Sequence, residues 1–153
     1  MMYLGIDPGT SCGWALLDAS GQRVGSGAWN LKPHRHEGGG MRYLRARRYL
    51  LEVLATAGQP VAVAYEEVRR HMSTDAAHVY GGIVGIVAAT CEEQGIPYQA
   101  LPVGQIKVHA TGKGNASKDA MMEAAHDRFG VRVLRDDEAD ALWIADLLRV
   151  QLA

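Results

Sequence analysis

Short apolar runs at the start of the chain predict three consecutive strands. Residues 3–6 form the first run, which ends at Asp7, and Pro8-Gly9-Thr10 has the composition of a turn. Residues 12–18 and 23–31 form the next two runs, and residues 19–22 between them are few enough for a hairpin turn. We therefore expect the chain to open with an antiparallel meander.

Beyond residue 40, helical and strand patterns alternate. Residues 41–57 place apolar side chains at helical spacing and arginines between them, and the continuously apolar run at 61–65 is typical of a central strand covered on both faces. The later elements expected are a helix at 75–94, a strand at 96–101, helices at 103–109 and 117–129, and a last helix from Asp136 onward. Three glycines in the second helix (Gly81, Gly82 and Gly85) indicate that another backbone approaches it, within the domain or across a dimer.

This order predicts an α/β protein. Three hairpin strands followed by strands separated by helices indicate a five-stranded mixed sheet, with three antiparallel and then two parallel strands, flanked by helices. A chain of 153 residues, 48% of them hydrophobic, fits one domain spanning residues 1–153. Two distant cysteines, Cys12 and Cys91, argue against a disulfide framework or a structural zinc site. No apolar segment is long enough to cross a bilayer and no signal peptide is visible, so we expect an intracellular, cytoplasmic protein without a membrane partner.

Acidic residues occur where predicted elements meet. Asp7 follows the first strand, and Glu66 and Glu67 follow the fourth; by strand alternation only one of these two glutamates can face the same side as Asp7. Asp137 and Asp140 are three residues apart, so both leave one face of the last helix, which Asp136 or Asp137 can cap. Because ligands of open α/β sheets bind at the carboxyl ends of strands, these acids are candidates for one site.

Clustered carboxylates with few nearby His or Cys ligands select hard divalent cations, Mg²⁺ or Mn²⁺. Two such ions about 3.5–4 Å apart can hold the attacking water and the leaving oxygen in phosphodiester hydrolysis. Net charge is only −1, but basic residues gather at 42–48, 69–70 and 107–118. A basic rim around an acidic pocket would attract phosphate once metal ions neutralise the acids.

The succession of Ile6-Asp7-Pro8-Gly9-Thr10, Tyr65-Glu66, Lys107, Lys118 and Asp137-x-x-Asp140-Ala141-Leu142 resembles the RuvC family of Holliday junction resolvases, in the ribonuclease H-like superfold. The resemblance covers nearly the whole chain. It implies a homodimer that uses Mg²⁺, with two ions in each active site, to nick four-way DNA junctions at paired positions. It implies catalytic and metal-binding roles for Asp7, Glu66, Asp137 and Asp140. It favours Glu66 over Glu67, because the family places the acid directly after the apolar run.

The resemblance also implies a basic residue near the scissile phosphate, which maps to Lys107 or Lys118. The side chains expected to contact DNA are Arg69, Arg70, Lys107, Lys113 and Lys118. An aromatic residue that the family often places three positions after the strand-end glutamate is Arg69 here, and the turn after Asp7 is shorter than in typical bacterial members. With the short chain, these departures suggest a compact, phage-like variant that cleaves branched DNA more broadly.

Three alternative functions are compatible with parts of the pattern. Asp7-x-Gly9-Thr10 also resembles the phosphate loop of the actin and sugar-kinase class, although 153 residues cannot hold the two lobes of that class. A non-catalytic nucleic-acid-binding module would have no need of all four acids. A nuclease for RNA–DNA hybrids would share the acid cluster, because fold alone does not fix the substrate.

Overall fold

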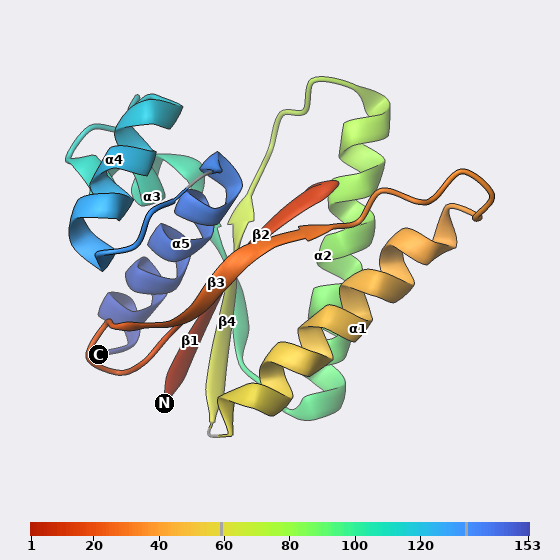
Figure 1. The fold of residues 1–153 in the computed structure, drawn as a ribbon, viewed down its shortest axis with the longest axis horizontal. Coiled ribbons are helices and arrows are strands. Elements are labelled where there is room, and N and C mark those ends of the chain that lie inside the picture. The colour runs from red at the N-terminus through yellow and green to blue at the C-terminus, as the bar shows by residue number, and fades with distance from the viewer. Residues whose placement is uncertain (59, 134) are drawn as a thin grey trace.

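Five strands form one mixed sheet in the order β3-β2-β1-β4-β5 (Figure 1). The computed structural model describes residues 1–58, 60–133 and 135–153. The strands are β1 (Met2–Asp7), β2 (Ser11–Leu17), β3 (Arg23–Asn30), β4 (Val61–Glu67) and β5 (Tyr98–Pro102). β1 pairs antiparallel with β2 and β2 with β3, whereas β4 runs parallel to both β1 and β5. The mixed sheet expected from the sequence, three antiparallel strands and then two parallel ones, is confirmed.

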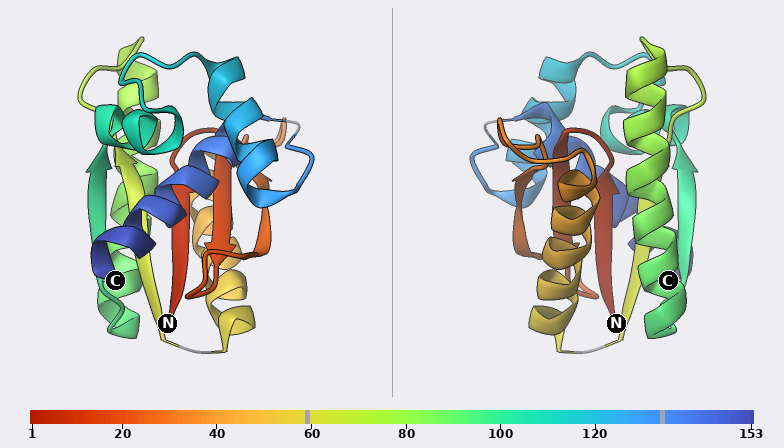
Figure 2. Two further views of the ribbon diagram at one scale, coloured as in Figure 1. Left: turned by 90° about the vertical axis from the view of Figure 1, so that its left-hand side faces the viewer. Right: turned by 90° about the vertical axis from the view of Figure 1, so that its right-hand side faces the viewer.

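Helices cover both faces of the sheet. They are α1 (Gly40–Ala57), α2 (Thr74–Gln94), α3 (Val103–Thr111), α4 (Lys118–Phe129) and α5 (Asp136–Leu152). α1 and α2 lie on one face, and α5 crosses the other with α3 and α4 beside it (Figures 1 and 2). Among the described residues, none of these helices is long and apolar enough to cross a membrane.

The expected boundaries are close to the observed ones, and the largest difference is at β5. The sequence predicted a strand from residue 96, but β5 begins at Tyr98. Gly95 ends α2 with a positive φ of 67°, and the amide of Ile96 donates to the carbonyl of Cys91 at 2.8 Å. Ile96 therefore belongs to the turn that closes α2, and the chain becomes extended only after Pro97.

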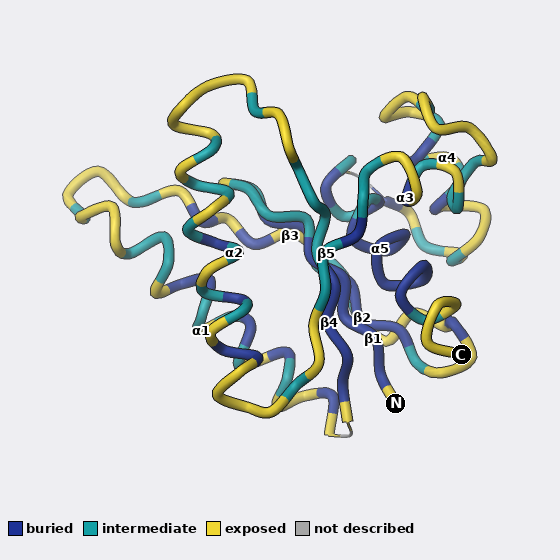
Figure 3. Tube along the Cα trace, turned by 180° about the vertical axis from the view of Figure 1, so that it is seen from behind, coloured by how far each residue is buried: buried dark blue, intermediate teal, exposed yellow. Residues whose placement is uncertain are grey.

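Alternate residues of the strands build two separate cores. Tyr3, Ala62 and Ala64 face α5, whereas Leu4, Ile6 and Val63 face α1 and α2. This alternation follows from the pleat of a strand, which sends successive side chains to opposite faces. The strands run through the buried centre of the molecule, and exposed segments lie in the loops and on the outer faces of α1 and α2 (Figure 3).

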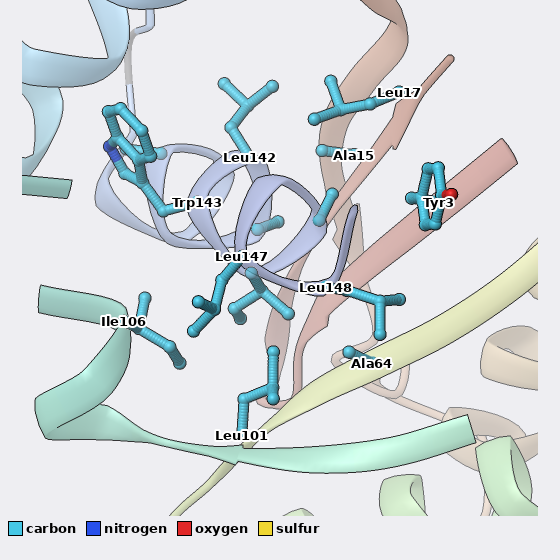
Figure 4. Packing of buried hydrophobic residues seen from close by; sticks show 14 of the residues in the cluster. Tyr3, Ala15, Leu17, Ala64, Leu101, Ile106, Leu142, Trp143, Leu147 and Leu148 are labelled. Carbon is cyan, nitrogen blue, oxygen red and sulfur yellow. The ribbon is translucent and has the colours of Figure 1, made fainter. Parts of the chain in front are cut away.

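α5 is buried on almost all sides. Every residue from 141 to 148 is buried, and Leu142, Trp143, Leu147 and Leu148 pack among side chains of β1, β2, β4, β5 and α3 (Figure 4). The helix can approach the sheet this closely because two strand residues facing it are glycines. A Cβ on Gly5 would lie 2.2 Å from the carbonyl oxygen of Ala141, and one on Gly13 would lie 1.9 Å from that of Asp137.

The glycines of α2 have a different environment from the one expected. A Cβ on Gly82 would lie 2.3 Å from the ring of Tyr43, so this glycine accommodates a side chain of α1 and not a backbone. Gly81 and Gly85 are exposed, and a Cβ at either position would have no neighbour within 4 Å. The predicted close approach within the domain is therefore wrong for these two.

We expect Gly5→Ala to lower the thermal stability of the protein, because the new methyl group would collide with the backbone of α5. Overpacking of this kind costs about 1–3 kcal/mol, more where backbone must move. Thermal unfolding followed by circular dichroism measures the effect. Gly104→Ala is the matched control, since a Cβ there has no neighbour within 4 Å. Equal melting temperatures for Gly5→Ala and wild type would show that α5 does not rest on this glycine.

Candidate active site

Asp7 and Glu66 lie side by side at the carboxyl ends of neighbouring parallel strands. The register pairs Ile6 with Tyr65, so the next residues along both strands are also adjacent. Glu66 shares its strand face with Ala62 and Ala64, which pack against α5. Glu67 points to the opposite face and accepts a hydrogen bond from Nε of Arg69 at 3.1 Å. Of the two glutamates, Glu66 is therefore the one beside Asp7.

α5 brings two further carboxylates to this end of the sheet. Asp137 and Asp140 lie in its first turns, above Gly13 of β2 and close to Asp7. The expected capping role is wrong, because Arg135 is the N-cap residue and no side chain caps the helix. Asp136 and Asp137 are instead inside the first turn, where the helix dipole still favours negative charge.

The Asp137 carboxylate is engaged by its neighbours. It accepts a short hydrogen bond from the Ser11 hydroxyl, and Nε of Arg135 lies 3.2 Å from its Oδ1. Nη2 of Arg135 also donates to the Ser11 hydroxyl at 2.9 Å. The sequence analysis missed Ser11 and Arg135. Ser11 could have been noticed because it starts the strand that follows the Asp7 turn, but its partner is 126 positions away.

Burial and mutual repulsion act on the other three carboxyl groups, and their pKa values are raised. Burial raises the pKa of Asp7 well above its usual value, and the charges of Glu66, Asp140 and Asp137 raise it further. Burial also raises the pKa of Glu66, and burial with the nearby Glu66 charge raises that of Asp140 to about 7. A hydrogen bond between the Asp7 and Glu66 side chains raises the pKa of Asp7 and lowers that of Glu66. The cluster therefore holds protons at a pH where isolated carboxyl groups would be ionised.

Lys107 faces the carboxylates from α3. Its charge lowers the pKa of both Glu66 and Asp140, which places its ammonium group on their side of the helix. Lys118 lies farther out, at the exposed start of α4, where its Nζ is 3.4 Å from Asp136. Lys113 is exposed in the loop between α3 and α4. Of the two lysines that the sequence left open, Lys107 is the one the fold places beside the acids.

The four acids offer the oxygen ligands that hard divalent cations prefer, and their raised pKa values indicate a site short of positive charge. The four carboxylates lie farther apart than they would around a bound metal ion. Within the described ranges, no three His, Cys, Asp or Glu side chains are grouped closely enough to hold a metal ion. Asp137 contributes to this spread because it is turned onto Ser11 and Arg135. The donor set fits a divalent metal, provided that the side chains draw together around it.

A cleft of about 690 Å³ lies at the same end of the sheet but on its α1 and α2 side, between the turn after β1, the start of α1 and the segment leading into α2. We call it the side cleft; its wall includes Gly9, Thr10, Arg42, Arg70, His71 and Tyr80. Nε of Arg42 is buried and has no hydrogen-bond partner among the described residues. The hydroxyl of Tyr80 donates to the carbonyl of Glu66 at 2.7 Å and accepts from the amide of Val68 at 3.1 Å. The cleft is thus joined directly to the strand end that carries Glu66.

The basic residues after β4 are divided between two environments. Arg69 is exposed and paired with Glu67, whereas Arg70 lines the side cleft. The sequence analysis missed the side cleft and Tyr80, because both depend on how α1 and α2 pack around the turn after β1.

We expect Asp140→Asn to be more stable than wild type at pH 8 in EDTA. The folded protein holds a proton on Asp140 up to about pH 7, and the unfolded chain loses it near the ordinary pKa of 3.8. Stability from this group is therefore present below pH 4 and lost as pH rises to 7. The neutral amide avoids that loss, and each kcal/mol corresponds to roughly 2–4 °C in melting temperature. Calorimetric scans from pH 4 to 8 should show a difference in melting temperature between Asp140→Asn and wild type that grows as pH rises.

Asp127→Asn provides the control, because Asp127 is exposed on α4 and is not among the charges that shift the pKa of Asp7, Glu66 or Asp140. A gap between Asp140→Asn and wild type that stays constant with pH would contradict the raised pKa of Asp140.

Comparison with known proteins identifies relatives along almost the whole chain. Residues 3–146 match the family model described as crossover junction endodeoxyribonuclease RuvC. The RuvC protein of Anaeromyxobacter sp. strain Fw109-5 is 35% identical over 149 residues, which cover 95% of this chain and 71% of that relative. The RuvC protein of Brachyspira hyodysenteriae is 30% identical, over 95% of this chain and 91% of its own length.

The fold agrees with these matches. The structure of Thermus thermophilus RuvC in complex with a Holliday junction substrate superposes with a TM-score of 0.82 at 28% identity, covering 95% of this chain and 90% of that one. The RuvC protein of Prochlorococcus marinus is covered over 96% of its length at 30% identity. A phage-like character stays a prediction. Sequence, fold and family model agree, and the chain belongs to the RuvC family of crossover junction endodeoxyribonucleases.

Proposed function

We propose that this protein is a metal-dependent endonuclease that resolves four-way DNA junctions by paired nicks. The observation that carries the proposal is the meeting of Asp7, Glu66 and Asp140 from three separate elements, each altering the pKa of another. Its membership of the RuvC family, whose members are metal-dependent nucleases, supports the same activity. The Holliday junction bound to the Thermus relative supports branched DNA as the substrate.

The metal-binding residues in this proposal are Asp7, Glu66, Asp137 and Asp140, and the cofactor is Mg²⁺, with Mn²⁺ as a substitute. Two bound ions would activate the attacking water and stabilise the leaving oxygen of the phosphodiester. The three carboxyl groups whose pKa values are raised must lose their protons before they can hold these ions, because only carboxylates bind such ions tightly. Asp137 can join them when Arg135 releases it.

Lys107 is the residue we assign to the scissile phosphate. It lies opposite Glu66 and Asp140, so a phosphate held between these acids by metal ions would be close to its ammonium group. A fixed cation there stabilises the negative charge that builds on the phosphoryl oxygens during hydrolysis. Lys118, paired with Asp136 at the rim, is placed to contact the DNA backbone farther out, together with Lys113.

The side cleft gives the DNA strand a path away from the acids. Arg70 and Arg42 line it, and Arg42 brings a buried donor that lacks a partner among the described residues. A backbone phosphate would satisfy that donor. Arg69, exposed beside the cleft, can bind phosphate but lacks the aromatic ring that the family often places at this position. We therefore expect this protein to discriminate less among branched DNA substrates. RNA–DNA hybrids are the second nuclease substrate to test.

A homodimer is the assembly that paired nicking requires, because each protomer contributes one acid cluster. The exposed face of α2 supports it. Gly81 and Gly85 lie one turn apart there with open space above them, so a helix of a second copy could pack at close range. A two-fold axis through that face would use the same surface on both copies.

We expect wild-type protein with Mg²⁺ to nick a synthetic four-way junction on two opposing strands at symmetric positions. Asp7→Asn and Asp140→Asn should bind the junction with near wild-type affinity and lose at least about 100-fold in rate, because each removes a metal ligand. Denaturing gels of end-labelled strands measure cleavage, and gel shifts in Ca²⁺ or EDTA measure binding. A panel of junction, flap, fork, duplex and RNA–DNA hybrid then ranks the substrates.

Glu67→Gln is the matched control, since Glu67 follows Glu66 but points to the other face of the sheet. If Asp7→Asn cut the junction at the wild-type rate, the assignment of Asp7 as a metal ligand would be overturned. Binding without cleavage by the wild type would favour the non-catalytic module, and preference for the hybrid would make the protein a ribonuclease.

We expect Arg42→Gln and Arg70→Gln each to weaken junction binding and to reduce its salt dependence, because each removes a cation that binds one phosphate. The slope of log affinity against log salt should fall by about 1 for each phosphate that is no longer bound. Fluorescence anisotropy at several salt concentrations measures it. Arg48→Gln on the exposed part of α1, outside the cleft, should leave the slope unchanged. Equal slopes for all four proteins would mean that DNA does not enter the side cleft.

A further inference from the structure

A buried carboxylate far along α5 ties three helices together. Asp146 is 4% exposed, and its Oδ2 is 2.8 Å from Nε2 of His109 on α3. Its Oδ1 accepts from Nε and Nη2 of Arg149 at 3.0 and 2.9 Å, and Nη2 of Arg128 on α4 lies 3.5 Å away. Each oxygen thus has its own donor group.

The two sides of this network do different things. Arg149 is three residues after Asp146 on the same helix, so that pair neutralises the carboxylate without fixing another element. His109 reaches it from α3, which is 37 positions earlier in the chain. Burying a carboxylate costs free energy that apolar residues would not, and it is strongly unfavourable when a partner is removed. The contact with His109 therefore holds α3 in one place against α5.

α3 has few other means of being held. It is nine residues long, and among its residues only Ile106 is buried. Ile106 and His109 are three apart and share the face that meets α5, where the His109 ring also packs edge-on against Trp143 at 5.8 Å between centroids. Lys107 lies between these two anchors and faces Glu66 and Asp140.

We propose that His109 is a positioning residue, which fixes the rotation of α3 through Asp146 and so holds the Lys107 ammonium group over the acid cluster. The part that concerns catalysis rests on the proposed nuclease function. The location of Lys107 does not depend on that function. Removing the His109 side chain leaves Ile106 as the one buried anchor of α3, beside the partly buried Ala110, and we expect the helix then to turn more freely about its axis.

The first test measures Lys107 without any reaction. The chain has four lysines (Lys32, Lys107, Lys113 and Lys118), so ¹³C-methylation of lysine amines gives few NMR signals, and Lys107→Arg assigns the one of interest. In wild-type protein the Lys107 signal should differ in chemical shift from that of exposed Lys32, because it lies beside the carboxylates. In His109→Ala it should move toward the Lys32 signal, and in His109→Gln it should stay near its wild-type position, because the Gln amide can still donate to Asp146.

The second test measures single-turnover nicking of the junction. His109→Ala should lower the rate about 10- to 100-fold, because small misplacements of a catalytic group have effects of that size, while affinity stays within about twofold. His109→Gln should recover most of the rate. In the Lys107→Ala background, His109→Ala should have no further effect, since both changes remove the same contribution.

Arg149→Gln is the control for stability alone. It removes another partner of Asp146 but does not touch α3, so it should lower the melting temperature and leave both the Lys107 signal and the rate close to wild type. An unchanged Lys107 signal in His109→Ala would overturn the proposal. If the Lys107 signal is displaced in His109→Ala but the wild-type protein nicks no DNA, the positioning role would be supported and the nuclease function refuted.

Discussion

The contact between the backbone of α5 and the sheet determines where the chemistry can take place. Two glycines, Gly5 and Gly13, remove the side chains that would otherwise separate helix from strands, and the carbonyl of Asp137 lies where a Cβ of Gly13 would be. A helix resting on side chains would lie several ångströms farther out. Asp137 and Asp140 would then be too far from Asp7 to share an ion with it. The closeness of the acids is therefore a result of packing and not of any attraction among them.

The packing that brings the acids together also lowers the stability of the folded protein. Bringing like charges into a partly buried site is unfavourable, and the raised pKa values of Asp7, Glu66 and Asp140 express that cost. The large apolar surface that α5 buries elsewhere offsets it, as does the start of the helix, whose dipole favours the acids of its first turn. A divalent cation removes the repulsion. Metal binding and folding are then coupled through the same carboxylates.

Much of this arrangement follows from local sequence. Apolar runs ending in acids predict the strands and place Asp7 at the edge of the sheet, and strand alternation, once the packing face is known, separates Glu66 from Glu67. The side-chain partners could not be predicted this way. Asp137 binds Ser11, and His109 binds Asp146, across gaps of 126 and 37 positions that no local pattern spans. The helix start at Asp136 was predicted, but its N-cap residue, Arg135, was missed, because several consecutive acids each resemble a cap and only the backbone conformation distinguishes them.

The acid cluster joins the first strand of the sheet to the last helix of the chain. During synthesis Asp7 emerges early, and its partners Asp137 and Asp140 follow 130 and 133 residues later. A nascent or prematurely terminated polypeptide lacks both acids, and it also lacks the helix that covers one face of the sheet. The fold thereby delays assembly of the acid cluster until α5 has been made, so a nascent polypeptide that stops before this helix presents no finished cluster.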